Sequence, residues 1–517
     1  MMTIITYDIQ EPELQEDLRV ARPILAIGID LGTTNSLVAF SSDRTPYIIR
    51  DTKSHDALMP SAVSYSAGTI TVGAEALKAP HFISSIKRLM GKGIADAKHL
   101  HLPYVLQEKS TDRMIKLRID GHIKNPIEIS ADILRALKQR AEEVLQQKVE
   151  HAVITVPAYF DDSARSATRQ AAELAGIEVL RLLNEPTAAA LAYGLQTEKE
   201  GIYAVYDFGG GTFDISILRL HRGIFQVLAT GGDSNLGGDD FDFKILEHLL
   251  SGYVDIRALP EEDKNHILMA ARGIKEYLTH NPVWTGFLLA YGPLSITRET
   301  FEALIIGLVK KTLRILRNVL SDANLSVQDL SDTILVGGSS RVPLIKQMLT
   351  AFLKRSPLDT ISPDEIVALG SALQAEALTN QSDNLLLDVV PLSLGIELLG
   401  GITESIIPRN TPIPTIRTKV YTTDRDGQTG IKIHVVQGES EQVSKCRSLA
   451  RFELKDIPAM SAGRARISIS FKVDADGLLT ISAYEQSTNS SQEIEVRPSY
   501  GLTQDEMLEL LNPTLVK

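Results

Sequence analysis

The sequence predicts an α/β fold with an internal duplication, followed by a β-sandwich. Two observations predict the duplicated part: strands alternate with helical stretches, and one pattern of strand, Gly/Thr turn and strand occurs twice. A third predicts the sandwich, because short strand patterns with turns at residues 400–401, 426–427 and 476–477 fill the chain after residue 390. We therefore expect two similar half-domains that face each other, and then a strand-rich domain.

The repeated pattern can be read directly from two segments. The first spans residues 24–40, where the apolar runs ILAI and LVAF flank the turn GIDLGTTNS. The second spans residues 203–218, where YAVY and ISIL flank DFGGGTFD. Between and after them, apolar spacing predicts a helix over residues 130–148, a mainly helical stretch over 265–320, and a strand with a Gly turn over 333–343.

Composition and charge narrow the class of protein. At 517 residues the chain is too long for one core, so several folding units are expected. The formal charge of −12 disfavours nucleic acid as the main partner, and no apolar run reaches the roughly 18 residues that cross a bilayer. One cysteine, Cys446, cannot form an internal disulfide, and the acidic residues 1–23 do not resemble a secretory signal. A cytoplasmic protein without membrane partners is the expectation.

The two turns have the chemistry of phosphate loops. Glycines let backbone N–H groups approach phosphate oxygens, and Thr hydroxyls add donors. Asp30 and Asp207 end the preceding strands, where a carboxylate can hold Mg²⁺ through water. The spacing fits neither the P-loop nor the Rossmann fingerprint. One such turn alone is more often an ordinary hairpin, but two matched copies favour a nucleoside triphosphate site between the half-domains.

Four motifs carry a resemblance to a known family. They are GIDLGTTNS at residues 28–36, NEPTAAA at 184–190, DFGGGTFD at 207–214 and VGGSSRVP at 336–343. In order and spacing they resemble the seventy-kilodalton heat-shock chaperone family, over about residues 24–510. The resemblance implies an actin-like ATPase domain, a β-sandwich that binds peptides, and ATP with Mg²⁺ as cofactors.

Site residues are carried over from this family by motif. Asp30 and Asp207 resemble its Mg²⁺-water ligands. Lys87 resembles the lysine that orients the attacking water, and alone it would more often be a surface lysine. The resemblance implies that Glu185, Thr212 and Asp214 complete the catalytic set. It implies nucleotide contacts at Gly32, Thr33, Thr34, Asn35, Gly209, Gly210, Gly211, Thr212, Lys275, Gly337, Gly338, Ser339, Arg341 and Asp364.

The adenine side departs from the family pattern. Glu276 stands where the family usually has an arginine after Lys275, and Arg272 stands where it has a glutamate. An arginine plane stacks on a purine and a carboxylate does not. We expect weaker nucleotide binding than in general-purpose relatives.

The resemblance also implies a path from nucleotide to peptide. Pro157 and Arg165 resemble a relay between the cleft and a linker, although Pro157 alone could be an ordinary strand-end proline. Leu385, Leu386 and Leu387 resemble the linker segment that docks on the ATPase domain. Residues on segments matching the peptide pocket, which singly would be plain core, are Ile396, Leu399, Tyr421, Ile431 and Ile433.

Further stretches resemble one branch of the family. GDSNLGGDDFD at residues 232–242 and CRSLARF at 446–452 look like the HscA-type branch, which serves iron-sulfur cluster assembly. That branch implies a J-domain co-chaperone that stimulates the ATPase, and a scaffold protein as client. The alternatives are a general folding chaperone of the same family, a small-molecule kinase on the same fold, and a nucleotide-gated binding protein without hydrolysis.

The domain limits expected from these patterns run along the chain in order. An acidic arm occupies residues 1–23, the ATPase domain 24–382, the linker 383–389 and the β-sandwich 390–500. Residues 501–517 are expected to form one short helix, the start of a helical lid that relatives continue.

Overall fold

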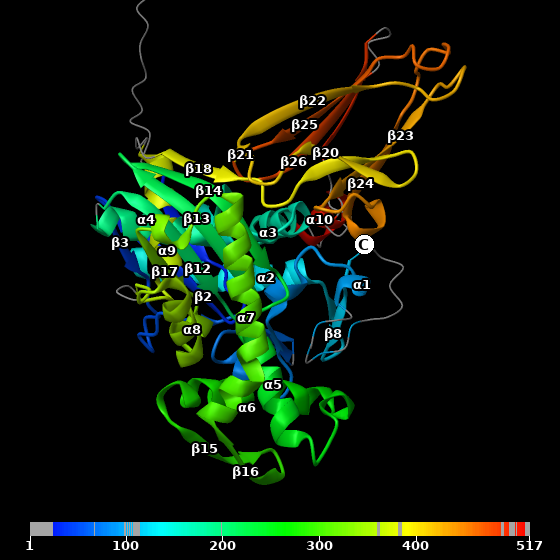
Figure 1. Cartoon of the computed structure of the whole chain (residues 1–517). Helices are drawn as coiled ribbons and strands as arrows, with labels where there is room; N and C mark the ends of the chain where they lie inside the picture. The colour runs from blue at the N-terminus through cyan, green and yellow to red at the C-terminus, as the bar shows by residue number, and fades with distance from the viewer. Residues whose placement is uncertain are drawn as a thin grey trace, which may run out of the picture.

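The computed structural model describes residues 24–511, apart from 67, 98–99, 101, 103, 105, 107–113, 198, 359–361, 381–384, 487–490, 496–501 and 503. The expected acidic arm, residues 1–23, therefore lies outside the described residues. Figure 1 shows an α/β body and a strand-rich domain beside it. The predicted fold class, a duplicated α/β domain followed by a β-sandwich, is confirmed.

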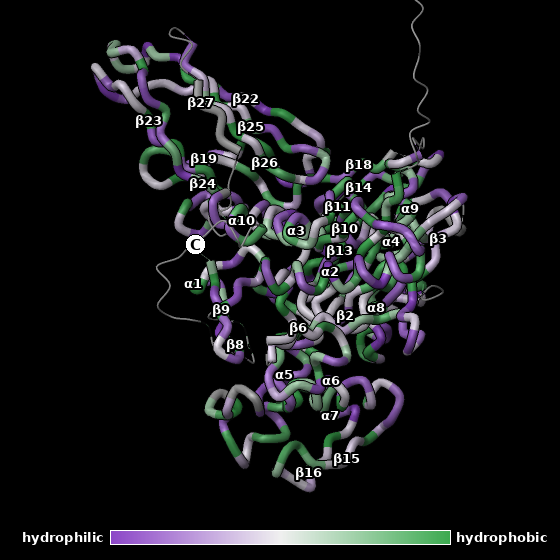
Figure 2. The backbone as a smooth tube through the Cα atoms, turned by 180° about the vertical axis from the view of Figure 1, so that it is seen from behind, coloured by the Kyte–Doolittle hydropathy of each residue, from purple (hydrophilic) through white to green (hydrophobic). Residues whose placement is uncertain are grey.

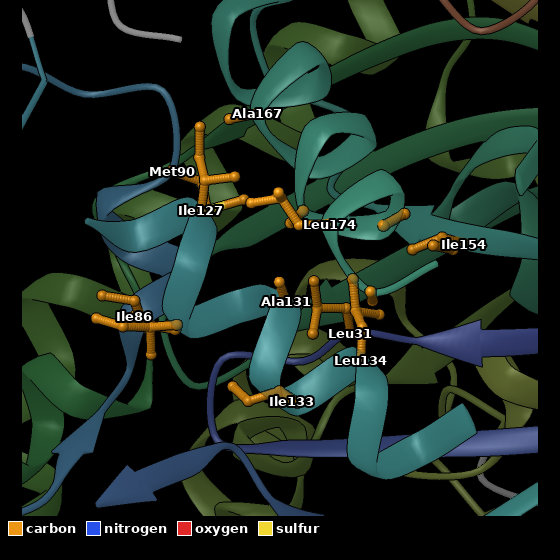
Figure 3. Close-up of a cluster of buried hydrophobic side chains, with 14 of the residues drawn as sticks. Leu31, Ile86, Met90, Ile127, Ala131, Ile133, Leu134, Ile154, Ala167 and Leu174 are labelled. Carbon is orange, nitrogen blue, oxygen red and sulfur yellow. The ribbon is translucent and has the colours of Figure 1, made fainter. Parts of the chain in front are cut away.

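The first half is built on one mixed sheet. Its order is β11-β10-β1-β2-β3, and β1 pairs antiparallel with β2 and parallel with β10. Helices α2 and α3 pack against each other over an apolar cluster, part of which Figure 3 shows. The elements of this half are β1 (Ala26–Asp30), β2 (Asn35–Ser42), β3 (Thr45–Ile48), β4 (Met59–Pro60), β5 (Ala62–Ser66), β6 (Thr69–Val72), β7 (Ile83–Ser84), α1 (Ile94–Ala97), β8 (Leu117–Ile119), β9 (His122–Lys124), α2 (Pro126–Leu145), β10 (His151–Val156), α3 (Asp162–Leu174), β11 (Glu178–Asn184) and α4 (Glu185–Thr197).

The second half repeats this plan. Strand β12 pairs antiparallel with β13 and parallel with β17, as β1 does with β2 and β10, so the predicted duplication is present. The elements are β12 (Gly201–Phe208), β13 (Phe213–His221), β14 (Ile224–Asp233), α5 (Gly238–Leu250), α6 (Glu261–His280), β15 (Val283–Leu288), β16 (Tyr291–Thr297), α7 (Arg298–Asp322), β17 (Asp332–Val336), α8 (Pro343–Leu353) and α9 (Ile366–Thr379). Helix α4 packs on α9 between the two sheets, and a Cβ on Gly370 would overlap the backbone of Ala188.

Of the two expected helical stretches, one has a different boundary in the structure and the other is interrupted by a hairpin. The helix expected over residues 130–148 begins earlier, at Pro126, because Asn125 and Glu128 form a capping box there. The stretch 265–320 is mainly helical, as expected, through α6 and α7, although the antiparallel hairpin of β15 and β16 separates the two helices. This hairpin lies at the far end of the molecule from the β-sandwich (Figure 1).

The β-sandwich consists of two four-stranded sheets. One has the order β20-β19-β23-β24 and the other β22-β25-β26-β27, with a shared apolar core. The strands are β19 (Leu394–Leu398), β20 (Ile402–Ile407), β22 (Thr415–Tyr421), β23 (Ile431–Gln437), β24 (Arg447–Leu454), β25 (Ile467–Val473), β26 (Leu479–Glu485) and β27 (Ser491–Glu495).

The linker forms a strand that joins the two domains. Strand β18 (Leu385–Val389) pairs parallel with β14 of the second half of the α/β domain and antiparallel with β21 (Pro412–Ile413) on the sandwich side. The short terminal helix expected from the sequence is α10 (Gln504–Leu511). Figure 2 shows it beside α3, where Leu502 exchanges two hydrogen bonds with the Gln170 side chain.

Candidate active site

A cavity of about 340 Å³ lies between the two half-domains. The paired turns of the duplication form its phosphate end, because β1–β2 and β12–β13 bring their turns to the same place. Of the site residues predicted from the sequence, its lining contains Asp30, Gly32, Thr33, Thr34, Asn35, Lys87, Glu185, Asp207, Gly209, Gly210, Thr212, Lys275, Gly337, Gly338, Ser339, Arg341 and Asp364.

Neighbouring backbone holds the second turn in place. Gly209 N–H donates to the Thr212 carbonyl at 3.1 Å, and the Gly209 carbonyl accepts from Gly238 N–H at 3.0 Å and from Ser339 Oγ at 2.8 Å. Gly211, which does not line the cavity, lies behind it against Thr33, where a Cβ would meet the Thr33 side chain at 2.8 Å. The turn is therefore fixed before any ligand arrives.

Four buried carboxylates surround the Lys87 ammonium. Lys87 pairs with Glu185, and its Nζ lies 5.9 Å from the centre of the Phe160 ring. Burial, with the Glu185 charge next, raises the pKa of Asp30 and of Asp214 to about 7. The same two causes raise the pKa of Asp207 well above its ordinary range. One ammonium does not balance this charge, so the site favours an added cation.

The carboxylates suit a cation held through water. Within the described part of the chain, no three Asp, Glu, His or Cys side chains converge closely enough to hold a metal directly. Asp30 accepts from Thr155 Oγ1 at 3.0 Å, and Asp214 accepts from Tyr159 N–H at 2.8 Å, so both oxygens are oriented. Hard carboxylate oxygens with water between fit Mg²⁺, which gives up its water reluctantly.

The end of the cavity away from the phosphate loops is lined by the two charged residues that differ from the family pattern. Arg272 and Glu276 both line it beside Lys275. Arg272 donates to Asp239 at 3.1 Å, and Lys275 pairs with Asp242 at 2.8 Å, so both cations are already engaged. Opposite them, Arg341 pairs with Asp364 at 2.5 Å.

Arg88 is a buried residue beside the site that the sequence analysis did not single out. Its guanidinium is buried and joins the first half to the second, through Asp240 at 3.2 Å and the Asn235 carbonyl at 3.1 Å. Together these contacts close the wall of the cleft beside the phosphate loops. No local signal in the sequence marks it, because its partner Asp240 lies 152 residues away along the chain.

The predicted relay residues lie where the two domains meet. Arg165 is buried, and it donates to Asn184 Oδ1 at 2.7 Å and to the Asp476 carbonyl of the sandwich at 3.2 Å. Pro157 precedes the Tyr159 contact to Asp214. Leu386 packs against the core between the two sheets, and Leu385 and Leu387 pair with Ile224 and Gln226.

The predicted peptide residues do not share one environment. Ile396 and Ile433 lie in the core of the sandwich, and Tyr421 and Ile431 pack against it. Tyr421 also donates to Glu404 at 2.7 Å. Leu399, in the turn between β19 and β20, is 79% exposed and is available to a partner.

Comparison with known proteins identifies the family. The model of the Hsp70 protein family matches residues 26–514. The chain belongs to the Hsp70 family. It is 50% identical over 509 residues to the "Chaperone protein HscA homolog" of Bordetella pertussis, covering 94% of this chain and 80% of that protein. It is 49% identical to the homologue of Vibrio cholerae and to the "Chaperone protein HscA" of Cronobacter sakazakii, each covering 95% of this chain and 81% of the relative.

This Hsp70 membership confirms the expected resemblance and its class of activity. Members of the family bind ATP and hydrolyse it in a chaperone cycle, so this chain is an ATPase of that class. The small-molecule kinase considered from the sequence is therefore set aside. Within the part of the chain that the structure describes, no helix is long and apolar enough to cross a membrane.

Proposed function

We propose that this protein is an ATP-dependent chaperone of iron-sulfur cluster assembly. Its similarity to curated HscA chaperones over nearly the whole chain supports this branch of the family. The observation that carries the activity is the Lys87 ammonium among four buried carboxylates, at the point where two phosphate loops meet. A general folding chaperone of the same family remains the alternative.

Different residues of the site contribute to different parts of ATP hydrolysis. Thr33, Thr34 and Gly210 line the cavity, and their backbone N–H groups would stabilise charge that develops on the γ-phosphoryl group. Asp30 and Asp207 would hold Mg²⁺ through water, and the ion would supply positive charge to offset that of the phosphate oxygens.

Lys87 and the remaining carboxylates act on the water molecule. The raised pKa of Lys87, which its carboxylate neighbours cause against the opposing effect of burial, keeps this ammonium charged so that it can orient an attacking water. Glu185 pairs with Lys87 in the docked arrangement, and Asp214 lies buried near it although it does not line the cavity, while Thr212 lines the cavity with its hydroxyl. No covalent nucleophile is needed.

The nucleotide and peptide ends are coupled through the linker. We place the ATPase domain at residues 24–382, the linker at 383–389, the peptide-binding sandwich at 390–500 and the start of a lid at 501–517. The pairing of β18 with both β14 and β21 supports this division. Leu399, which is exposed, and the partly buried Tyr421 and Ile431 would contact an extended client peptide, whereas Ile396 and Ile433 would support them from the core. Binding of that peptide must weaken ATP binding as much as ATP weakens peptide binding.

The expected partners of this protein are those that its resemblance to the HscA-type branch implies. A J-domain co-chaperone would stimulate hydrolysis, and a scaffold protein carrying the nascent cluster would be the client, in the cytoplasm. Steady-state ATP hydrolysis with each partner alone and with both tests this. Strong stimulation only with both supports the specialised role. Stimulation by unrelated unfolded peptides to the same extent would favour the general folding chaperone.

A further inference from the structure

Arg447 connects the β-sandwich to the two segments that surround the Lys87 ammonium. It opens β24 and belongs to the CRSLARF stretch at residues 446–452 that pointed to the HscA-type branch. One guanidinium nitrogen, Nη1, pairs with Asp161 Oδ2 at 2.6 Å, and the other, Nη2, donates to the Gly91 carbonyl. A single side chain of the sandwich therefore contacts two separate segments of the ATPase domain.

The first of these segments leads from Gly91 to Lys87. Residues 86–89 form a short 3₁₀ turn that begins after Ser85, and Met90 N–H donates to the Lys87 carbonyl at 3.3 Å. Ile86 and Met90 are buried in the cluster that α2 and α3 cover (Figure 3). Gly91 has a φ of +64°, and a Cβ there would overlap the backbone of Ser163 and Ala164. This loop is short and closely packed, so a displacement at Gly91 reaches Lys87.

The second segment leads from Asp161 to the other side of the same ammonium. Asp161 caps α3 by accepting from Ala164 N–H at 2.9 Å. Its neighbour Phe160 places its ring 5.9 Å from Lys87 Nζ, and Tyr159 N–H donates to Asp214 at 2.8 Å. Arg447 thus contacts both segments that lead to Lys87, one through Gly91 and the other through Asp161.

Two other contacts between the domains do not reach the loop 85–92, although the Asp162–Leu479 contact lies beside Asp161. Asp476 accepts from Leu182 N–H at 3.1 Å and pairs with Arg169, and Arg409 pairs with Asp322 of α7 at 2.7 Å. Neither contact involves residues 85–92. The Arg409 pair also joins the sandwich to the ATPase domain by one guanidinium, so it offers a matched control.

We propose that Arg447 is a positioning residue for hydrolysis: while the sandwich is docked, it fixes the loop 85–92 and keeps Lys87 paired with Glu185. This inference rests on the proposed function, and it adds how the sandwich regulates the site. When the sandwich leaves, both contacts of Arg447 are lost together. The loop then gains freedom, and Lys87 can leave Glu185 to orient the water.

Hydrogen exchange measured by mass spectrometry on the full chain with bound ATP tests the contact directly. In Arg447→Ala, amide exchange over residues 85–92 is expected to become faster. In Arg409→Ala it is expected to stay as in the wild type, while exchange near Asp322 rises. Asp161→Asn keeps a side chain that can cap α3 but removes the charge, and it is expected to shift the 85–92 amides in the same direction, by less.

Single-turnover ATP hydrolysis gives the second readout. Arg447→Ala is expected to hydrolyse ATP about threefold to tenfold faster than Arg409→Ala, since it loses two charge-assisted hydrogen bonds that restrain the loop. Unchanged exchange over 85–92, equal exchange in the Arg409 variant, or a rate that does not rise would each overturn the inference. A wild-type chain without ATPase activity would instead refute the proposed function, and the exchange result would still report on the contact.

Discussion

Thr34 of the first phosphate loop and Gly210 of the second touch across the cleft, and a Cβ on Gly210 would overlap the Thr34 hydroxyl oxygen. Gly210→Ala should therefore push the two loops apart. We expect a loss of ATP affinity of roughly tenfold or more, because a displaced loop misplaces several N–H donors at once. Isothermal titration with ATP measures it.

Gly209 offers the comparison for this variant. A Cβ there would meet its nearest atom, the Thr212 carbonyl oxygen, at 3.7 Å, which is an ordinary contact. Gly209→Ala should lose much less affinity than Gly210→Ala. Equal losses in the two variants would mean that loop flexibility, and not the contact with Thr34, sets the affinity.

We expect Glu276, which lines the cavity beside Lys275, to weaken nucleotide binding at the adenine side. Replacing it by arginine supplies a plane that stacks on a purine, so Glu276→Arg should tighten ATP binding by about twofold to fivefold, the range of an exposed cation–π contact. Glu276→Gln removes the charge without adding the plane and serves as the control. An unchanged affinity in the arginine variant contradicts the explanation, and an equal gain in both variants assigns the effect to charge alone.

Domain docking should depend on pH through Asp162. This carboxylate accepts from Leu479 N–H of the sandwich at 2.9 Å, and burial raises its pKa from 3.8 to about 7. An acid whose pKa is raised in the docked state favours docking when protonated. The ionised Asp162 carboxylate therefore opposes docking. This opposition is fully present above pH 7 and is relieved as the pH falls through 7, so the docking equilibrium constant should rise by roughly tenfold between pH 8 and pH 6.

Small-angle X-ray scattering at the two pH values measures the docked fraction. The raised pKa values of Asp388 and Asp476, both caused first by burial, act in the same direction. Asp162→Asn keeps an acceptor for Leu479 N–H and carries no charge, so it should dock more tightly at pH 8 and show a weaker pH dependence. A variant with the full wild-type pH dependence would show that Asp162 is not the group that titrates.

The linker strand should be sensitive to charge at Leu386. This side chain packs against the core shared by the two halves of the ATPase domain. A carboxylate there must be buried or the strand must leave, because an unpaired buried charge costs several kcal/mol. Leu386→Asp should keep basal ATP hydrolysis and lose stimulation by peptide, whereas Leu386→Val should keep both. A charged variant that peptide still stimulates normally would contradict a role for the docked strand.

Much of the fold was predictable because its signals are local. The two Gly/Thr turns and their flanking apolar runs predicted β1–β2 and β12–β13, and the duplication then predicted a cleft. The hairpin of β15 and β16 was missed, since apolar residues such as Val283 and Phe287 are exposed there and give no clear alternation. The capping box at Asn125 was readable but was overlooked.

The candidate site was predictable only where a motif repeats or is family-specific. Lys87 was found through its neighbours in the sequence, but Arg88 and Arg447 act through partners 152 and 356 residues away along the chain. No local pattern distinguishes such an arginine from one on a solvated surface. The same holds for Ile396 and Ile433, which lie in the core. An apolar residue on a strand gives the same sequence pattern whether it lines a binding pocket or packs in a core.

The placement of β18 in a sheet of the ATPase domain has a mechanical consequence. Its bonds to β14 and β21 make one continuous hydrogen-bonded sheet out of two folding units. Parallel strands pulled along their length share the load among all their hydrogen bonds, so the link yields in one step and does not peel. The two domains of this chaperone should accordingly separate abruptly under tension. A client that pulls on the sandwich would have to exceed a threshold force before the β14–β18 pairing breaks.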